Sequence, residues 1–151
     1  MATLDSSIAQ QSHNQEVFRR LIAVGFSGGD LSVVDDVCSP DFVEHPAGVH
    51  PANREGVKRL ITYLHQALPD LTCAIEEMVA SGDTVWARVR ARGTHRGTFM
   101  GVAPTGRMVT VDIVDVSRFD GGKIVEHWGI SDRLATLEQL GSGRSLPQAS
   151  E

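Results

Sequence analysis

The segment from residue 118 to 132, RFDGGKIVEHWGISD, combines a hairpin pattern with residue types that could move protons. The β-branched and aromatic residues on either side of Gly121 and Gly122 predict two strands joined by a tight turn. The second strand carries His127 between a glutamate and a tryptophan. Histidine titrates near neutral pH and a carboxylate partner can fix its tautomer, so His127 is a candidate acid/base residue.

The carboxylate that faces His127 depends on the register of this hairpin. A three-residue loop at 120–122 would set Asp115 opposite His127, with Cβ atoms about 5 Å apart. A two-residue turn of Gly121–Gly122 would set Asp115 opposite Trp128 instead. Either glycine can take a positive φ, so the sequence allows both registers. We favour the first because both polar side chains then share one face, as an acid/base pair or as two buried groups that only satisfy each other.

Three further residues are candidates for substrate contact. His45, in the segment DFVEHP, is either a hydrogen-bonding group at the mouth of a pocket or an exposed loop histidine. Trp128 follows His127 directly and could shape the site. Arg88 is a weaker candidate, because it shares one side of its strand with Trp86 and other arginines, a pattern typical of a solvated or interface face.

Other chemistries lack their sequence signals. No histidine pair or glutamate–histidine pair has the spacing of a zinc or di-iron site, so we expect no metal. The glycines between 97 and 106 lie between two predicted strands, whereas a phosphate loop would open a helix. No Gly-x-Ser-x-Gly segment marks a serine nucleophile. Acid/base chemistry at His127 therefore remains the candidate chemistry.

Length and composition bound the remaining possibilities. The chain has 151 residues and a 41% hydrophobic content, which fits one globular domain. A formal net charge of −5 argues against nucleic acid as a partner. No apolar run is long enough to span a membrane and the N-terminus lacks a signal-peptide core, so we expect a cytoplasmic protein. The two cysteines, Cys38 and Cys73, are expected to be free thiols.

Hydrophobic periodicity predicts an α+β fold, because helical segments come first and a meander of strands follows. The polar segments 1–10 and 142–151 are expected to be flexible tails around a single domain at 11–141. A short extended piece is expected at 42–45, among the prolines of an irregular segment. We expect helices at 11–27, 30–39 and 54–68, and antiparallel strands at 71–81, 84–95, 107–119 and 123–131.

Both faces of the predicted strand at 109–119 are partly apolar. A sheet with one solvated face would instead alternate apolar and polar residues. One face of this strand could therefore pack on the helices while the other meets a second subunit.

Three segments carry a resemblance to a known family: DFVEHPAGVHPANREGVKRLI, GTHRGTFMGVAPTGR and FDGGKIVEHW. Over about residues 12–140 the chain resembles the SnoaL-like polyketide cyclases, or ester cyclases, of the nuclear transport factor two-like superfamily. The resemblance implies a cone-shaped, curved antiparallel sheet that wraps around the N-terminal helices and encloses an apolar pocket. It also implies a homodimer or higher homo-oligomer that packs through the outer face of the sheet.

The family implies ring closure by intramolecular aldol condensation, without metal or cofactor, on a small apolar carbonyl compound. Its characterised cyclases use an aspartate on the last strand as the acid/base, assisted by a neighbouring histidine. Here His127 takes that place and Asp115 or Asp112 lies on the adjoining strand, so the residue types are exchanged.

The leading hypothesis makes His127 the base, Asp115 its orienting partner, and His45 and Trp128 the residues that shape the pocket. The alternatives are an epoxide hydrolase or a ketosteroid-type isomerase on the same scaffold, or a non-enzymatic dimer that binds a small molecule.

Overall fold

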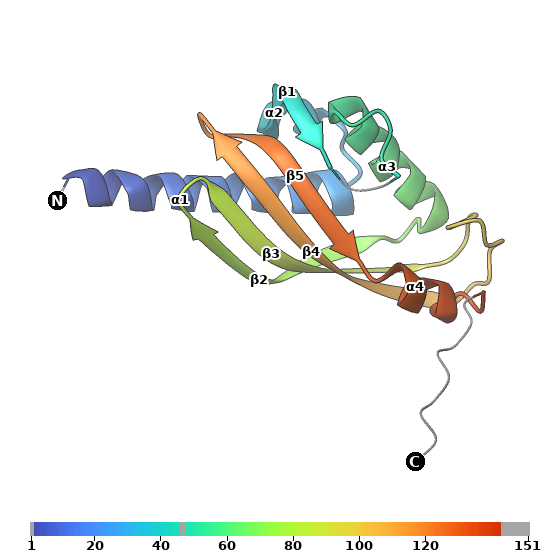
Figure 1. Cartoon of the computed structure of the whole chain (residues 1–151). Coiled ribbons are helices and arrows are strands. Elements are labelled where there is room, and N and C mark those ends of the chain that lie inside the picture. Colours follow the sequence, from blue (N-terminus) through green and yellow to red (C-terminus); the bar gives the residue numbers. More distant parts are fainter. Residues whose placement is uncertain (1, 46–47, 143–151) are drawn as a thin grey trace, which may run out of the picture.

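The computed structural model describes residues 2–45 and 48–142, and it has the expected α+β architecture (Figure 1). Five strands form one curved sheet in the order β1-β5-β4-β3-β2. The last four strands form an antiparallel meander, as the periodicity of the sequence predicted. The strands are β1 Cys38–Glu44, β2 Thr72–Ser81, β3 Thr84–Thr94, β4 Met108–Asp120 and β5 Lys123–Ser131.

Strand β1 corrects the expectation of a wholly antiparallel sheet, because it pairs with β5 in parallel. The strand is also longer than the extended piece predicted at 42–45. Because it begins at Cys38, the preceding helix ends earlier than the predicted bound at residue 39. The strand contains Pro40 and lies at the edge of the sheet, where proline is tolerated. Its pairing partner lies at the other end of the chain, so local periodicity gives no sign of its direction.

The helices pack on the sheet and around its β1 edge (Figure 1). Helix α1 continues into a π-helical segment, η1, in place of a single predicted helix at 11–27. Helix α3 begins after Asn53, whose Oδ1 accepts from the backbone N–H groups of Glu55 and Gly56. The helices are α1 Ala2–Arg20, η1 Leu21–Ser27, α2 Ser32–Val37, α3 Arg54–Ala67 and α4 Arg133–Gln139.

Two helical segments depart from the sequence expectation. Helix α1 begins at Ala2, so residues 2–10 are helical although they were expected to form part of a flexible tail. No glycine or proline interrupts the chain between residues 2 and 24, and the polar residues there face solvent where the helix extends past the strands (Figure 1). Helix α4 was not predicted; Asp132 caps it by accepting from the N–H of Ala135 at 2.9 Å. The predicted tail at 142–151 lies almost wholly outside the described residues.

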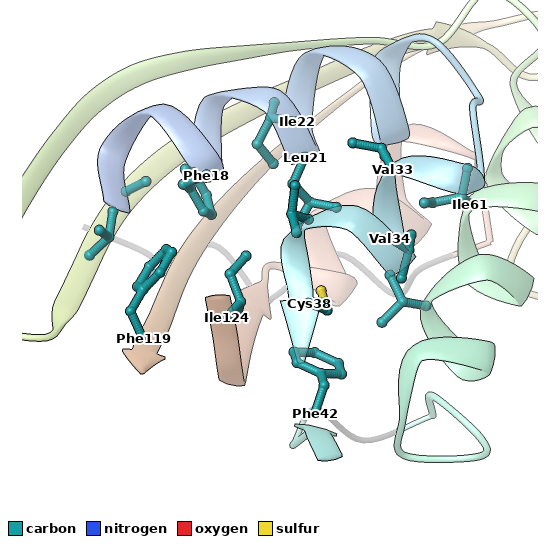
Figure 2. Packing of buried hydrophobic residues seen from close by; sticks show 14 of the residues in the cluster. Phe18, Leu21, Ile22, Val33, Val34, Cys38, Phe42, Ile61, Phe119 and Ile124 are labelled. Atoms are coloured by element: carbon teal, nitrogen blue, oxygen red, sulfur yellow. The ribbon is translucent and has the colours of Figure 1, made fainter. Parts of the chain in front are cut away.

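The apolar core consists of two clusters, which lie at opposite ends of the inner face of β4. In the first cluster, Phe18, Leu21 and Ile22 point from the helices toward Phe119 and Ile124 of the β4–β5 hairpin (Figure 2). The second cluster surrounds the other end of β4, and its buried members are Ala67, Leu68, Leu71, Phe99, Val109 and Leu140.

Strand alternation gives the sheet an inner, core-facing side and an outer side. On β3, Val85, Ala87 and Val89 are buried and Trp86 is exposed, as the sequence pattern predicted. No helix within residues 2–45 and 48–142 is long and apolar enough to cross a membrane.

Candidate active site

The β4–β5 hairpin closes with a two-residue turn, which corrects the favoured three-residue loop. Gly121 and Gly122 have φ values of 55° and 78°, and Asp120 pairs with Lys123. Positive φ at both central positions is the geometry of a type I′ hairpin turn, and it matches the twist of the two strands.

A β-bulge next to the turn changes the register again. Phe119 pairs with Ile124 and Arg118 with Glu126, so Val125 is an extra residue on β5. Beyond the bulge, His127 lies opposite Ser117 rather than opposite either residue that the two simple registers predicted. The bulge escaped notice because neither strand shows a break in its apolar pattern there.

Asp115 and His127 nevertheless meet, as diagonal rather than direct neighbours on the inner side of the sheet. The Nε2 atom of His127 lies 2.9 Å from Oδ1 of Asp115. The residue opposite Asp115 is Gly129, and a Cβ added there would lie 3.1 Å from both Asp115 Oδ1 and His127 Cε1. The missing side chain at Gly129 therefore leaves the space in which the imidazole reaches the carboxylate.

A second carboxylate, which sequence reasoning missed, completes the site. Glu44 lies beside His127 in the parallel β1–β5 pair, and its Oε1 and Oε2 lie 2.8 and 3.0 Å from His127 Nδ1. The side chains of Glu44 and Asp115 are 4% and 9% exposed, and that of His127 is 15% exposed. The alternation with buried Phe42, two positions earlier, was the available signal that Glu44 points inward.

The electrostatics of this Glu44–His127–Asp115 cluster favour a charged imidazole. Burial by itself lowers the pKa of His127, but the hydrogen bonds to Asp115 and Glu44 outweigh it and raise the pKa to about 10. His127 is then an imidazolium at neutral pH, and it donates one N–H to each carboxylate. A cation held this way keeps a fixed positive charge beside the carboxylate of Asp115.

The three candidates for substrate contact lie on the outer side of the sheet, away from His127. His45 stacks on Trp128 with ring centroids 4.4 Å apart and an interplanar angle of 5°, and its Nε2 lies 3.5 Å from Glu126. Arg88 pairs with Glu77 at 3.1 Å. The structure does not bring these residues to the inner cluster, because adjacent residues of a strand point to opposite sides.

Asp112, the alternative partner for His127, also lies on the outer side. Its two carboxylate oxygens accept from Nε and an Nη atom of Arg90 at 2.8 and 3.1 Å. This bidentate pair assigns Asp112 to the outer side of the sheet and leaves Asp115 as the aspartate of the inner cluster.

The inner face of β4 is buried to different degrees on the two sides of Asp115. On one side of Asp115 along this face, Ser117 and Phe119 are fully buried; on the other side, Ile113 and Val111 are only half-buried. Two surface hollows, of about 490 Å³ between α1 and β2 and about 310 Å³ along α3, are not lined by any residue of the cluster. The expected deep apolar pocket therefore remains a prediction.

Comparisons with known proteins agree with this fold. Residues 15–140 match the family model of the SnoaL-like polyketide cyclase. The aklanonic acid methyl ester cyclase DnrD of Streptomyces peucetius is 26% identical over 141 residues, which cover 88% of this chain and 94% of that protein.

Solved structures superpose over most of the chain. AclR, a proposed hydroxylase from Streptomyces galilaeus, is 31% identical with a TM-score of 0.79 and covers 91% of both chains. IdmH, a proposed polyketide cyclase from Streptomyces antibioticus, is 36% identical with a TM-score of 0.74 and covers 85% of this chain and 98% of its own. The match to the family model and these shared folds show that the chain belongs to the SnoaL-like polyketide cyclase family.

Proposed function

We propose that this protein closes a ring in a small polyketide-type carbonyl compound by intramolecular aldol condensation, with Asp115 as the proton acceptor. The observation that carries the proposal is the mostly buried carboxylate of Asp115, hydrogen-bonded to His127 on the inner side of the sheet. The membership of this chain in the SnoaL-like polyketide cyclase family, together with a relative named as a cyclase, supports this class of reaction.

The charge of the cluster assigns the roles. His127, whose pKa is raised to about 10, already carries a proton on each nitrogen at neutral pH and has no lone pair to accept another. The sequence hypothesis made His127 the base; we assign that role to Asp115 and make His127 the fixed cation beside it. Glu44 is the less available carboxylate, because both of its oxygens lie on His127 Nδ1.

The proposed reaction needs only the substrate and these side chains. Asp115 removes a proton from a carbon between two carbonyl groups, so that a C–H bond breaks and the carboxylic acid of Asp115 forms. The resulting enolate carbon attacks another carbonyl carbon, farther along the same molecule. A C–C bond forms, and the π electrons of the attacked carbonyl group move to its oxygen, which becomes an alkoxide. Asp115 returns its proton to the alkoxide, which gives the hydroxyl group and regenerates the carboxylate. The pocket adds an orientation effect by folding the chain of the substrate into a reactive shape.

The test is the substitution Asp115→Asn, which keeps the size of the side chain and removes the proton acceptor. We expect the cyclisation rate of a β-keto methyl ester substrate such as aklanonic acid methyl ester, and deuterium exchange at its acidic carbon, to fall about 10²- to 10⁴-fold. Asp112→Asn is the matched control, since Asp112 is on the same strand but on the outer side. Undiminished exchange in the Asp115 variant would remove Asp115 from the mechanism.

Epoxide hydrolysis is the second candidate, and the pair of carboxylates around one cation favours it. In that reaction one carboxylate accepts a proton from water while an acid protonates the epoxide oxygen. Turnover of an epoxide in ¹⁸O-labelled water, with label in the diol, would select this reaction over ring closure. A ketosteroid-type isomerase has less support, because Tyr63 on α3 is exposed and its hydroxyl accepts from the N–H of Met100 at 2.7 Å. Absence of turnover in every assay would favour the non-enzymatic binding module.

We also propose that two copies pair through the outer side of the sheet. Large apolar side chains are exposed there on four neighbouring strands and define an outer apolar patch: Val79, Trp86, Val114 and Ile130. An apolar surface that spans four strands is typical of a protein–protein interface.

A further inference from the structure

Glu44 contacts the cluster in a way that a simple acid/base pair does not require. Asp115 alone would satisfy one nitrogen of His127 and fix its tautomer. Glu44 adds a second carboxylate on the opposite nitrogen, with both oxygens at 2.8 and 3.0 Å from Nδ1. It comes from an edge strand 83 residues away in the sequence, and its side chain is only 4% exposed. A buried carboxylate at such a position needs a charged partner, and His127 is that partner.

Two carboxylates make the loss of the proton from His127 unfavourable. If His127 became neutral, Glu44 and Asp115 would remain as two mostly buried anions with no cation between them. The charged groups that face the imidazole are Glu44 from β1 and Asp115 from β4. On β5 itself, the adjacent Glu126 points to the outer side, where Arg118 donates to it at 2.6 Å. At the other end of β1 from Glu44, burial raises the pKa of the Cys38 thiol to about 12 and leaves it neutral.

We infer that Glu44 is a positioning residue: its carboxylate locks His127 as a doubly donating cation, so that His127 cannot accept a proton and Asp115 is the more available of the two carboxylates for that role. The catalytic consequence rests on the proposed function, whereas the locked charge of His127 is a property of the folded protein alone. In this arrangement Glu44 touches neither substrate nor reacting atoms and acts through the ring of His127.

The substitution Glu44→Gln separates the charge from the shape of the side chain. A glutamine at position 44 can still hydrogen-bond to Nδ1, but it donates to a neutral ring and removes one of the two anions. Loss of an opposite charge at this distance lowers a histidine pKa by about one to three units. The variant should therefore bring the titration of His127 down toward neutral pH, while Asp115 keeps its hydrogen bond to Nε2.

The experiment follows the side-chain nitrogens of His127 by NMR on the full chain labelled with ¹⁵N-histidine, as pH is raised from about 6 to 9. The chain has 6 histidines, so the His127 signals are assigned by their loss in His127→Gln. We expect imidazolium shifts for both nitrogens across this range in the wild type, and a titration inside it in Glu44→Gln. Glu126→Gln is the matched control, because it removes the carboxylate of the residue next to His127, which points to the outer side of the sheet.

Two outcomes would overturn the inference: a wild-type His127 that titrates near its usual pKa, or a Glu44→Gln variant in which His127 remains an imidazolium. If Glu44→Gln does not fold, the wild-type titration and the shorter Glu44→Asp variant, which should lower the pKa of His127 by weakening its contact, still decide it. Because no substrate is involved, the result stands apart from the proposed reaction. With an active substrate, Glu44→Gln should add a pH-dependent limb to kcat/KM in the range where His127 loses its proton, whereas a merely structural defect would lower kcat/KM equally at all pH values.

Discussion

Gly129 is the residue of the site that acts through the absence of a side chain. A Cβ at this position would lie 3.1 Å from Asp115 Oδ1 and 3.1 Å from His127 Cε1. Gly129→Ala should therefore push the two groups apart while leaving the Glu44 contact on Nδ1 in place. We expect activity to fall about tenfold, and the pKa of His127 to fall because its hydrogen bond to Asp115 is weakened.

The activity assay and the ¹⁵N titration of His127 together check this expectation. Overpacking of this kind also costs stability, on the order of 1–3 kcal/mol, which a denaturant titration measures. An alanine variant with full activity and an unchanged His127 titration would show that the space at Gly129 is not needed.

The charge of His127 also predicts how stability depends on pH. Its pKa of about 10 in the folded protein lies above the ordinary value of 6.5, so the folded state keeps a proton that the unfolded chain loses. The contribution of His127 to the free energy of unfolding is fully present below pH 6.5 and is lost as the pH rises toward 10.

Urea titrations at about pH 6.5, 7.5 and 8.5 measure this effect; the two cysteines, whose pKa values burial raises in the folded protein, add to the decline only near the upper end of this window. We expect the free energy of unfolding to decline by about 1 kcal/mol per pH unit over this window. The Glu126→Gln variant should show the same slope. A wild-type stability that stays constant from pH 6.5 to 8.5 would contradict a locked imidazolium.

At the scale of elements, the two glycines of the β4–β5 turn are not equivalent. Gly121, at φ 55°, has no atom within 4 Å of an added Cβ, whereas a Cβ at Gly122, at φ 78°, would lie 2.9 Å from Nε2 of His13. Gly121→Asn should change stability by less than about 0.5 kcal/mol, because asparagine tolerates the left-handed region.

Gly122→Val should cost more than about 1 kcal/mol, since a β-branched residue at positive φ is strained and also meets His13. Urea midpoints with unchanged m-values measure both variants, and adding His13→Ala to Gly122→Val should recover only the steric part. Equal costs at the two positions would show that backbone strain alone decides the turn.

The elements that the sequence predicts well are those whose signal is local. The apolar stripe of α3 and the alternation of β3, with Val85 inward and Trp86 outward, gave bounds close to those observed. The cluster was only partly predictable. Asp115 and His127 were expected to meet, but the bulge at Val125 and the gap at Gly129 determine how they meet, and neither breaks the apolar pattern. Glu44 was missed because its partner strand lies far along the chain.

At the scale of the whole molecule, the outer apolar patch should decide the oligomeric state. Ile130 lies on β5, at one side of the patch; it is 70% exposed and pairs with Val114 on the adjoining strand. Ile130→Glu should convert the dimer that we propose into a monomer, because burying an unpaired carboxylate in an apolar interface is costly. Size-exclusion chromatography with light scattering measures the mass of each variant.

The control is Leu4→Glu, which changes an equally exposed residue (68%) on α1, away from the sheet. It should leave the mass unchanged. If the wild type is already a monomer at micromolar concentration, the patch has another use. If Ile130→Glu stays a dimer, the two copies meet elsewhere.

The parallel pairing of β1 with β5 has a consequence for how the chain is made. Glu44 leaves the ribosome 83 residues before His127, a delay of roughly 4 to 17 s at common rates of synthesis of about 5–20 residues per second. Throughout that interval β1 has no strand with which to pair, and the carboxylate of Glu44 has no imidazole to contact. The Glu44–His127–Asp115 cluster is therefore among the last features to assemble on the nascent chain, and a chain truncated before β5 would contain two of its three residues and none of its geometry.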